Sequence, residues 1–354
     1  QTASLTVALE GPPGPPPPPP NPPPPPPQPL QPATVSGHVY GFKLAPGTVL
    51  SPTQKAVARV SIARNGIYAL PPFAGAVTFF TVNDEGGPYT FGNLFSLNQT
   101  TFYAVFGIED SASNPATFTP LLLGVLRGVR PDPAKAISNA DIILDTHLDQ
   151  SVDVTVLDPP SVSGGHDAFI DLDLGQAGAI PLGRMTQNSD PFHLRFDHIP
   201  LAAGQGFVFV DQYGRWTGNG ITTPVSTYLR RVFGDLGGGV TLGPLLPFPV
   251  MQQTGPDTFS WTTAPSPLQP NLQQLRVQDG TSQGDTSWSV LLPGDAQRIT
   301  TPAPIRARLQ PGRHGFSIVT SVAPSFDFAH WTYSDLFSGN WTAYAFADGS
   351  FTVP

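Results

Sequence analysis

Residues 192–199 read Phe-His-Leu-Arg-Phe-Asp-His-Ile. In this stretch the apolar residues Leu194 and Phe196 alternate with the polar residues His193 and Asp197. Successive side chains of a β-strand point to opposite faces, so this period of two places apolar groups on one side and polar groups on the other. The stretch therefore predicts a half-buried β-strand.

Similar short runs recur along the chain and are separated by turns rich in Gly, Pro, Asn and Asp. The expected strands are 35–42, 57–63, 77–82, 89–94, 102–108, 121–126 and 141–144, then 152–157, 168–174, 192–199, 207–213 and 228–233, then 258–263, 272–277, 287–292, 315–322 and 341–353. Short strands at this spacing are typical of β-sandwiches. The sequence predicts an all-β protein with tandem β-sandwich domains at 34–148, 149–251 and 252–354. Only a short helix is expected at the proline-rich segment 264–270.

Composition supports the same fold class and excludes several functions. The 354 residues include 36 Gly and 44 Pro, which oppose long helices. Only 12% of residues are charged and the net charge is −8, without a basic patch, so nucleic acid is not an expected partner. Cysteine is absent, which excludes disulfides, thiolate metal sites and a thiol nucleophile.

The sequence also bears on location. It has no uninterrupted apolar stretch of the ~18 residues that a membrane helix needs, so no membrane span is expected. The chain begins with Gln1 rather than Met, which is typical of a mature, processed chain; a trimmed chain would begin in the same way. We therefore expect an extracellular or cell-surface protein.

The first residues form an isolated strand pattern. Residues 1–11 contain Ala3, Leu5, Val7 and Leu9 in strict alternation with small or polar residues. A linker at 12–33 follows, and its first part, Pro12 to Pro27, is proline except for Gly14 and Asn21. Such a tract adopts polyproline II, and at ~3.1 Å per residue it holds its ends roughly 50 Å apart. A lone strand is unstable in water, so this one is expected to pair elsewhere.

Three interpretations of this arm remain open. In the first, the protein is a secreted structural subunit that forms a head-to-tail filament with copies of itself, using Ala3, Leu5, Val7 and Leu9 for strand donation. In the second, the protein is a monomeric stalked adhesin, or a module that binds a surface glycan or protein. In the third, the arm docks on its own first domain. The acceptor domain cannot be chosen from sequence.

The first region resembles the carboxypeptidase-regulatory-like family. The resemblance rests on Val35-Ser-Gly-His-Val39, on Ala56-Val-Ala-Arg-Val60, on residues 84–94 (Asp-Glu-Gly-Gly-Pro-Tyr-Thr-Phe-Gly-Asn-Leu) and on Phe102-Tyr-Ala-Val. It covers roughly residues 35–146 and implies a seven-stranded, transthyretin-like sandwich. The Pro-Gly pair that usually follows the family's G-x-Y-x-F pattern is not present.

The third region is similar to fibronectin type III and immunoglobulin-like modules. Phe259-Ser-Trp261 resembles their tryptophan strand, Leu275-Arg-Val277 their central strand, and Leu309-Gln-Pro-Gly312 the turn before the tyrosine corner, where this chain carries Phe316. The stretches Phe326-Asp-Phe328 and Phe351-Thr-Val353 resemble proline-rich surface lipoproteins of myxobacteria-like bacteria. These resemblances imply spacers or binding modules at the cell surface and no enzymatic activity.

The densest polar constellation supplies the metal candidates His166, Asp171, Asp173, His193 and Asp197. Carboxylates and imidazoles can bind Ca²⁺ or Zn²⁺, but no stretch has the spacing of a known calcium loop. Strand alternation alone would place these residues on the wet face of a sheet. We expect that interpretation to hold, with no cofactor and no metal.

No catalytic residue is assigned from sequence. A serine hydrolase would need a G-x-S-x-G elbow on alternating strands and helices, and the chain has neither. Tyr213 and Trp216 could stack on a sugar, although a hairpin packed on tryptophan explains the same stretch and is preferred. Asn98 and Asn340 match the N-glycosylation sequon, whose use depends on the source of the protein.

Overall fold

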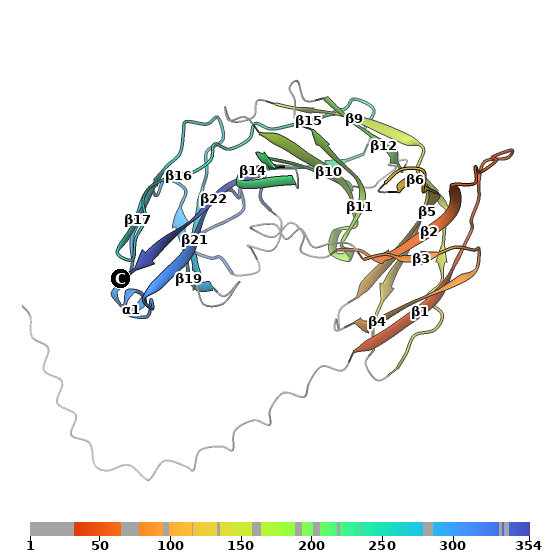
Figure 1. Cartoon of the computed structure of the whole chain (residues 1–354), viewed down its shortest axis with the longest axis horizontal. Helices are drawn as coiled ribbons and strands as arrows, with labels where there is room; N and C mark the ends of the chain where they lie inside the picture. The colour runs from red at the N-terminus through yellow and green to blue at the C-terminus, as the bar shows by residue number, and fades with distance from the viewer. Residues whose placement is uncertain are drawn as a thin grey trace, which may run out of the picture. The chain divides into compact units, whose positions relative to one another are not determined.

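The computed structural model describes residues 32–64, 78–94, 99–114, 116–132, 135–157, 164–187, 193–200, 206–217, 220–234, 236–278, 286–332, 335 and 340–354. Within Pro32–Pro354, one compact unit, the elements are almost all strands (Figure 1). The described residues also include the short α-helix α1 (Ala303–Arg306) and the 3₁₀ turn Gly175–Ala177. The predicted all-β class is therefore confirmed.

The first region is a sandwich of two sheets. Its strands are β1 (Ala33–Tyr40), β2 (Gln54–Ile62), β3 (Phe80–Val82), β4 (Gly87–Leu94), β5 (Thr100–Asp110), β6 (Thr117–Val129), β7 (Ile142–Ile143) and β8 (Thr146–His147). A sheet ordered β4-β1-β7 faces one ordered β3-β2-β5-β6-β8. Alternate residues such as Val35, Val60, Phe102 and Phe106 fill the core between the two sheets.

The second region packs against the first. Its strands are β9 (Gln150–Val156), β10 (Gly165–Asp173), β11 (Ala179–Gln187), β12 (His193–Ile199), β13 (Gly206–Thr217), β14 (Gly220–Phe233) and β15 (Val240–Leu242). A sheet ordered β12-β9-β15 covers the strands β11-β10-β13-β14. The core between them continues into Tyr103 and Leu123 of the first region, so these two regions share buried surface.

The third region is again a sandwich. Its strands are β16 (Val250–Gln253), β17 (Thr258–Thr262), β18 (Leu272–Gln278), β19 (Thr286–Pro293), β20 (Arg298–Thr300), β21 (Gly312–Val322) and β22 (Ala343–Val353). A sheet ordered β16-β17-β20 covers the strands β22-β21-β18-β19. Trp261, Leu275, Val277 and Phe316, which carry the resemblance to fibronectin type III modules, lie together in its core.

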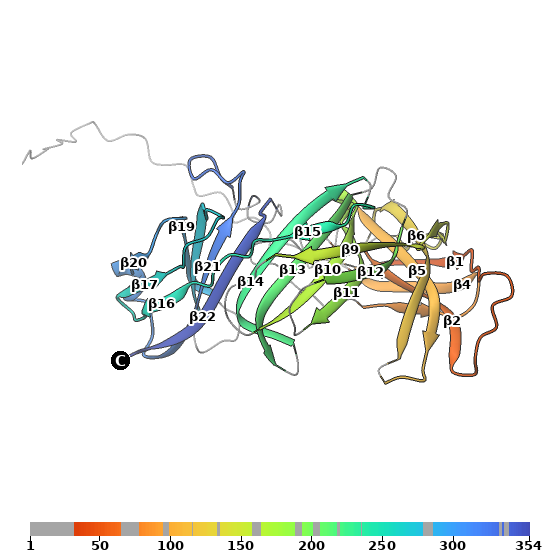
Figure 2. The ribbon, with the colours of Figure 1, turned by 90° about the horizontal axis from the view of Figure 1, so that it is seen from above.

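One sheet runs through the second and third regions. Residues Val225 to Tyr228 of β14 pair in antiparallel fashion with Phe346 to Ala343 of β22, which produces a sheet of eight strands, β11-β10-β13-β14-β22-β21-β18-β19. Figure 2 shows β14 and β22 side by side. The domain limits 149–251 and 252–354 remain a prediction. The hydrogen-bonded ladder between β14 and β22 crosses the boundary between these two predicted domains.

Several elements differ from the sequence-based expectations, and the short strands β8, β15, β16 and β20 lie outside every expected range. The segment 263–271 has no helix, and the helix α1 instead follows Pro302, which begins its first turn. Strand β11 was not predicted because Pro181 and Gly183 interrupt its apolar pattern. A register shift beside Ile170 and Asp171 of β10, which pair with Gly183 and Pro181, accommodates both residues.

Candidate functional site

The proposed metal candidates lie on two different sheets. His166, Asp171 and Asp173 belong to β10, whereas His193 and Asp197 belong to β12. No group of three His, Asp or Glu side chains that could hold a metal ion occurs among the described residues. The structure therefore does not bring the five candidates together, and the absence of a metal requirement stays a prediction.

His166 is fully buried and pairs with an aspartate that sequence reasoning did not select. Its Nδ1 lies 2.9 Å from Oδ2 of Asp211, and both residues are 0% exposed. The ring of Tyr213 lies 4.7 Å from that of His166. Burial raises the pKa of the Asp211 carboxyl, and its hydrogen bond to His166 opposes that rise. The pair is enclosed within the second region and supports packing rather than a site open to solvent.

The prediction of a wet face is wrong for β10. Asp171 is only 2% exposed and Asp167 only 6%. Asp167 accepts hydrogen bonds from Nε and Nη2 of Arg184 at 2.7 and 2.6 Å. Both faces of β10 are covered because the strand lies inside the long sheet between two layers of side chains. Period-two alternation cannot distinguish a buried polar face from a solvated one.

The prediction holds for β12. His193 and Asp197 are exposed, and Arg195 between them donates to Asp197 Oδ1 at 3.1 Å. Arg195 also lies 3.5 Å from Asp153 on the neighbouring strand β9. A register shift between Asp197 and Ile199 disturbs the pairing of β12 with β9. Charges and bulges of this kind discourage an edge strand from pairing with another chain.

A cavity of about 330 Å³ lies beside the proline-rich segment 263–270. The only ionisable residue that lines it is Asp295. Gln273 at this cavity is 2% exposed, and its amide already bonds Trp261 Nε1, Gly294 O and Ala296 O. The lining residues include no His, Lys or Cys, so they do not present the nucleophile–histidine pair that a serine hydrolase uses.

The residues predicted to serve self-assembly, Ala3, Leu5, Val7 and Leu9, lie outside the described residues. The folded part can still be compared with what an acceptor strand would need. An acceptor needs a strand edge whose backbone groups are not already used, with an apolar core beside it. Two strands inside their sheets, β1 and β22, differ in how far a neighbouring segment pairs along one of their sides.

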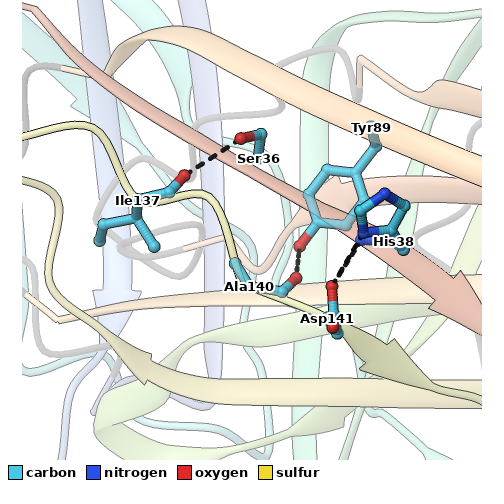
Figure 3. Close-up of polar contacts among 6 residues, drawn as sticks. All are labelled: Ser36, His38, Tyr89, Ile137, Ala140 and Asp141. Atoms are coloured by element: carbon cyan, nitrogen blue, oxygen red, sulfur yellow. Dashed lines mark hydrogen bonds and ion pairs between the residues drawn. The ribbon is translucent and has the colours of Figure 1, made fainter.

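The edge of β1 is closed by a later segment of the same sandwich, as Figure 3 shows. Ile137 O accepts hydrogen bonds from Ser36 N at 2.8 Å and Ser36 Oγ at 3.1 Å. Further along, Ala140 N donates to Ser36 O, and Asp141 Oδ1 accepts from His38 N at 2.9 Å. β7 then pairs with the end of β1. The backbone of β1 is therefore engaged on both sides.

The closing segment also fits tightly against β1. A Cβ atom on Gly37 would overlap the carbonyl oxygen of Ala140, so only glycine permits this approach. The hydroxyl of Tyr89 on β4 donates to the same Ala140 carbonyl (Figure 3). Burial raises the pKa of Tyr89, which keeps the phenol protonated as a donor. This sandwich is complete at β1.

The edge of β22 is only partly used by β14. β22 extends over eleven residues, and β14 pairs with Ala343 to Phe346 alone. The remaining seven residues, 347–353, continue past the end of this ladder. Ala347, Phe351 and Val353 face the core of the third sandwich, whereas Ser350 and Thr352 are exposed. This stretch has the alternation and the adjacent apolar core that an added strand requires.

Comparison with known proteins leaves the family open. No protein-family model matches the chain, and no curated protein matches it. Among solved structures, the chain is similar to the FN1–FN3 domains of chicken CNTN1, with 8% identity and a TM-score of 0.17, over 80% of this chain and 93% of that one. A TM-score of this size does not define a shared fold. Among the described residues, no helix is long and apolar enough to cross a membrane.

Proposed function

We propose that this is a non-enzymatic structural or adhesive protein of the cell exterior, whose copies join by strand donation. Residues 3–9 of one copy would add to the edge of β22 in the next copy, and the proline tract 12–27 would act as the spacer. A contact of this kind does not close on itself and produces a filament. The carrying observation is the seven-residue stretch 347–353 of β22 beyond its ladder with β14.

Length and pattern match between donor and acceptor. The donor presents Ala3, Leu5, Val7 and Leu9 at alternate positions over seven residues. The acceptor places Ala347, Phe351 and Val353 beside the third core. Each fully buried Leu or Val side chain contributes roughly 1.5–3 kcal/mol, before the cost of ordering the arm. The pairing of β14 with the first part of β22 supports this proposal, because it is the same kind of addition within one chain.

The alternative is a monomer that presents its sandwiches on the proline tract as an adhesin or ligand-binding module. The closed edge of β1 favours it, because a first sandwich that is complete needs no strand from another copy. One expectation distinguishes the two functions. Strand donation requires residues 1–11 for assembly, whereas a stalked binding module remains a monomer.

Engineered disulfides test the donation, since the chain has no cysteine of its own. The pair Thr6→Cys with Thr352→Cys places thiols on the outward faces of donor and acceptor. We expect oxidation to produce a ladder of covalent multimers on a non-reducing gel. The matched control is Thr6→Cys with Thr34→Cys, because Thr34 is exposed on β1, whose edge is closed. The control should run as a monomer on the same denaturing gel, because its copies assemble without forming a disulfide.

Deletion of residues 1–11 provides the second measurement. The truncated protein should sediment as a folded monomer, while the full chain assembles. A cross-linked product that runs as a monomer would instead show that the arm docks on its own chain. Assembly that persists after the deletion would refute donation by this arm.

A further inference from the structure

The connection between β21 and β22 presents an aromatic group that no sequence argument assigned a role. We call residues 323–332 the aromatic loop. Phe326 lies 5.0 Å from Phe328 in an edge-to-face arrangement and 5.8 Å from Trp331, measured between ring centroids. Phe328 is 41% exposed, and Phe326 and Trp331 are partly exposed. The three rings therefore form a small aromatic surface that solvent reaches.

Local hydrogen bonds and packing hold this loop in shape. Asp327 accepts from Ala329 N at 2.8 Å, and its Oδ2 lies 2.7 Å from His330 Nδ1. Two backbone turns add to this, from Phe326 N to Ala323 O and from His330 N to Asp327 O. Phe326 and Trp331 also pack on the core that contains Trp341 and Tyr344. A ligand would thus find the rings already placed and would incur little ordering cost.

Polar groups stand directly beside the rings. The side chains of Asp327 and His330 are 60% and 83% exposed. The hydrogen bonds from His330 and from the Ala329 amide hold the pKa of Asp327 below its ordinary value, so this carboxylate is ionised at neutral pH. A surface that combines aromatic faces with exposed hydrogen-bonding groups suits a ligand with both C–H faces and hydroxyls.

We propose that the aromatic loop is a binding site for a neutral carbohydrate, in which a sugar ring stacks on Trp331 or Phe328 and its hydroxyls bond to Asp327 and His330. The weakly positive C–H groups of a sugar face complement the negative face of an aromatic ring. Nucleobases also stack on such rings, but a chain of net charge −8 repels their phosphates. The Asp327 carboxylate disfavours acidic sugars for the same reason.

The size of the surface separates a sugar from a protein partner. A stable protein interface buries about 800 Å² on each side. Of the large apolar side chains that are exposed in the described part of the chain, only Phe328 belongs to this loop; Phe233, Val250 and Ile143 lie on other strands. Three clustered rings match one or two sugar rings and fall short of a protein interface.

Of the two aromatic residues considered from sequence, the structure describes the side chain of Tyr213, whereas that of Trp216 lies outside the described residues. Tyr213 is 4% exposed and packs against His166 and Phe248, so it cannot stack on a sugar. The sequence signal for the aromatic loop is four aromatic residues within 326–333, Phe-Asp-Phe-Ala-His-Trp-Thr-Tyr, three of them placed by the structure. Only the fold shows that these three gather on an exposed connection rather than in a core.

Affinity electrophoresis of the full chain tests the proposal. The gels contain hydroxyethylcellulose, arabinoxylan or galactomannan as neutral probes and polygalacturonate as the acidic one. We expect retardation by at least one neutral probe and none by polygalacturonate. Trp331→Ala should weaken binding at least tenfold and Phe328→Ala at least threefold, whereas Trp331→Phe should retain most of the affinity. Asp327→Asn should weaken binding while leaving the melting temperature nearly unchanged.

Phe233→Ala is the matched control. Phe233 is 74% exposed on β14, outside the aromatic loop, so this substitution should leave binding unaltered. If Trp331→Ala lowers the melting temperature, Phe328→Ala decides the outcome, because its ring is more exposed. The proposal is overturned if none of the neutral probes retards the wild-type protein, or if both alanine variants bind as the wild type does. It is also overturned if these variants abolish self-association instead, which would make the loop a protein contact.

Discussion

At the scale of single residues, buried polar side chains hold parts of the sandwiches together. Gln273 on β18 donates to Gly294 O at 2.6 Å and Ala296 O at 2.9 Å, and it accepts from Trp261 Nε1 at 2.6 Å. It therefore joins the tryptophan of one sheet to the turn beyond β19. A buried polar group that loses its hydrogen-bond partner costs about 1–3 kcal/mol of stability. The single side chain of Gln273 supplies the partner for three such groups.

Replacing this glutamine tests that role. Gln273→Leu leaves the Trp261 N–H and two carbonyls without their bonds, and we expect a loss of about 2–4 kcal/mol in the free energy of unfolding. Urea denaturation followed by tryptophan fluorescence measures it. Gln278→Leu, at an exposed position on the same strand, is the control and should change stability by less than about 0.5 kcal/mol. Equal effects of the two substitutions would contradict the role of Gln273.

An ion-pair group on β5 gives a pH-dependent prediction. Oε2 of Glu109 lies 2.9 Å from Nη2 of Arg59, and its Oε1 lies 3.0 Å from Nζ of Lys55, both on β2. The hydrogen bonds from these two groups lower the pKa of Glu109 below its ordinary value of 4.5. Because the folded state binds the proton more weakly, the stabilisation is present above pH 4.5 and is lost as pH falls through the lowered pKa.

Glu109→Gln should therefore destabilise the protein at neutral pH and have no such effect in strong acid, below the lowered pKa. The expected loss at neutral pH is below about 1 kcal/mol, because Lys55 is largely exposed and solvent screens the pair. Thermal unfolding of both proteins across this pH range measures the difference. A difference in stability between the wild type and Glu109→Gln that grows as the pH falls would contradict this assignment.

At the scale of elements, the β1 edge depends on close backbone approach. Gly37→Ala places a methyl group against Ala140 O, and we expect a loss of about 1–3 kcal/mol as the closing segment shifts. Gly92→Ala on the neighbouring strand β4 meets nothing within 4 Å and should be neutral or slightly stabilising. Chemical denaturation compares them. Faster hydrogen exchange of the amides at 137–141 in Gly37→Ala would locate the change in the closing segment. Identical stability of Gly37→Ala and Gly92→Ala would refute the close fit.

At the scale of the whole molecule, the eight-stranded sheet carries the largest consequence. Because β14 and β22 share a ladder and Tyr228 and Leu229 contact cores on the third-region side, residues from Gln150 to Val353 should unfold cooperatively. Trp261→Ala in the third core should then raise hydrogen exchange in β13 of the second region as well. Exchange confined to the third region, or two separate thermal transitions, would show independent domains instead.

The sequence alone determined the class of fold and most of the strands. Alternation such as Leu194 and Phe196 against His193 and Asp197 is a local property, and the structure places those side chains as the period predicts. The high content of Gly and Pro likewise disfavours helices, whatever the tertiary packing around these residues. The isolated pattern of Ala3, Leu5, Val7 and Leu9 remains a prediction that rests on sequence only.

Only the tertiary structure decided which polar residues are buried, which edges are closed and where aromatic rings gather. His166 and Asp211 are 45 residues apart and meet inside the fold, and Ser36 meets Ile137 across 101 residues. Such contacts depend on which strands become neighbours, and neighbouring is set by packing over the whole chain rather than by any local pattern. For the same reason the sequence does not predict the pairing of β14 with β22. The local pattern of a strand does not depend on which strand becomes its neighbour.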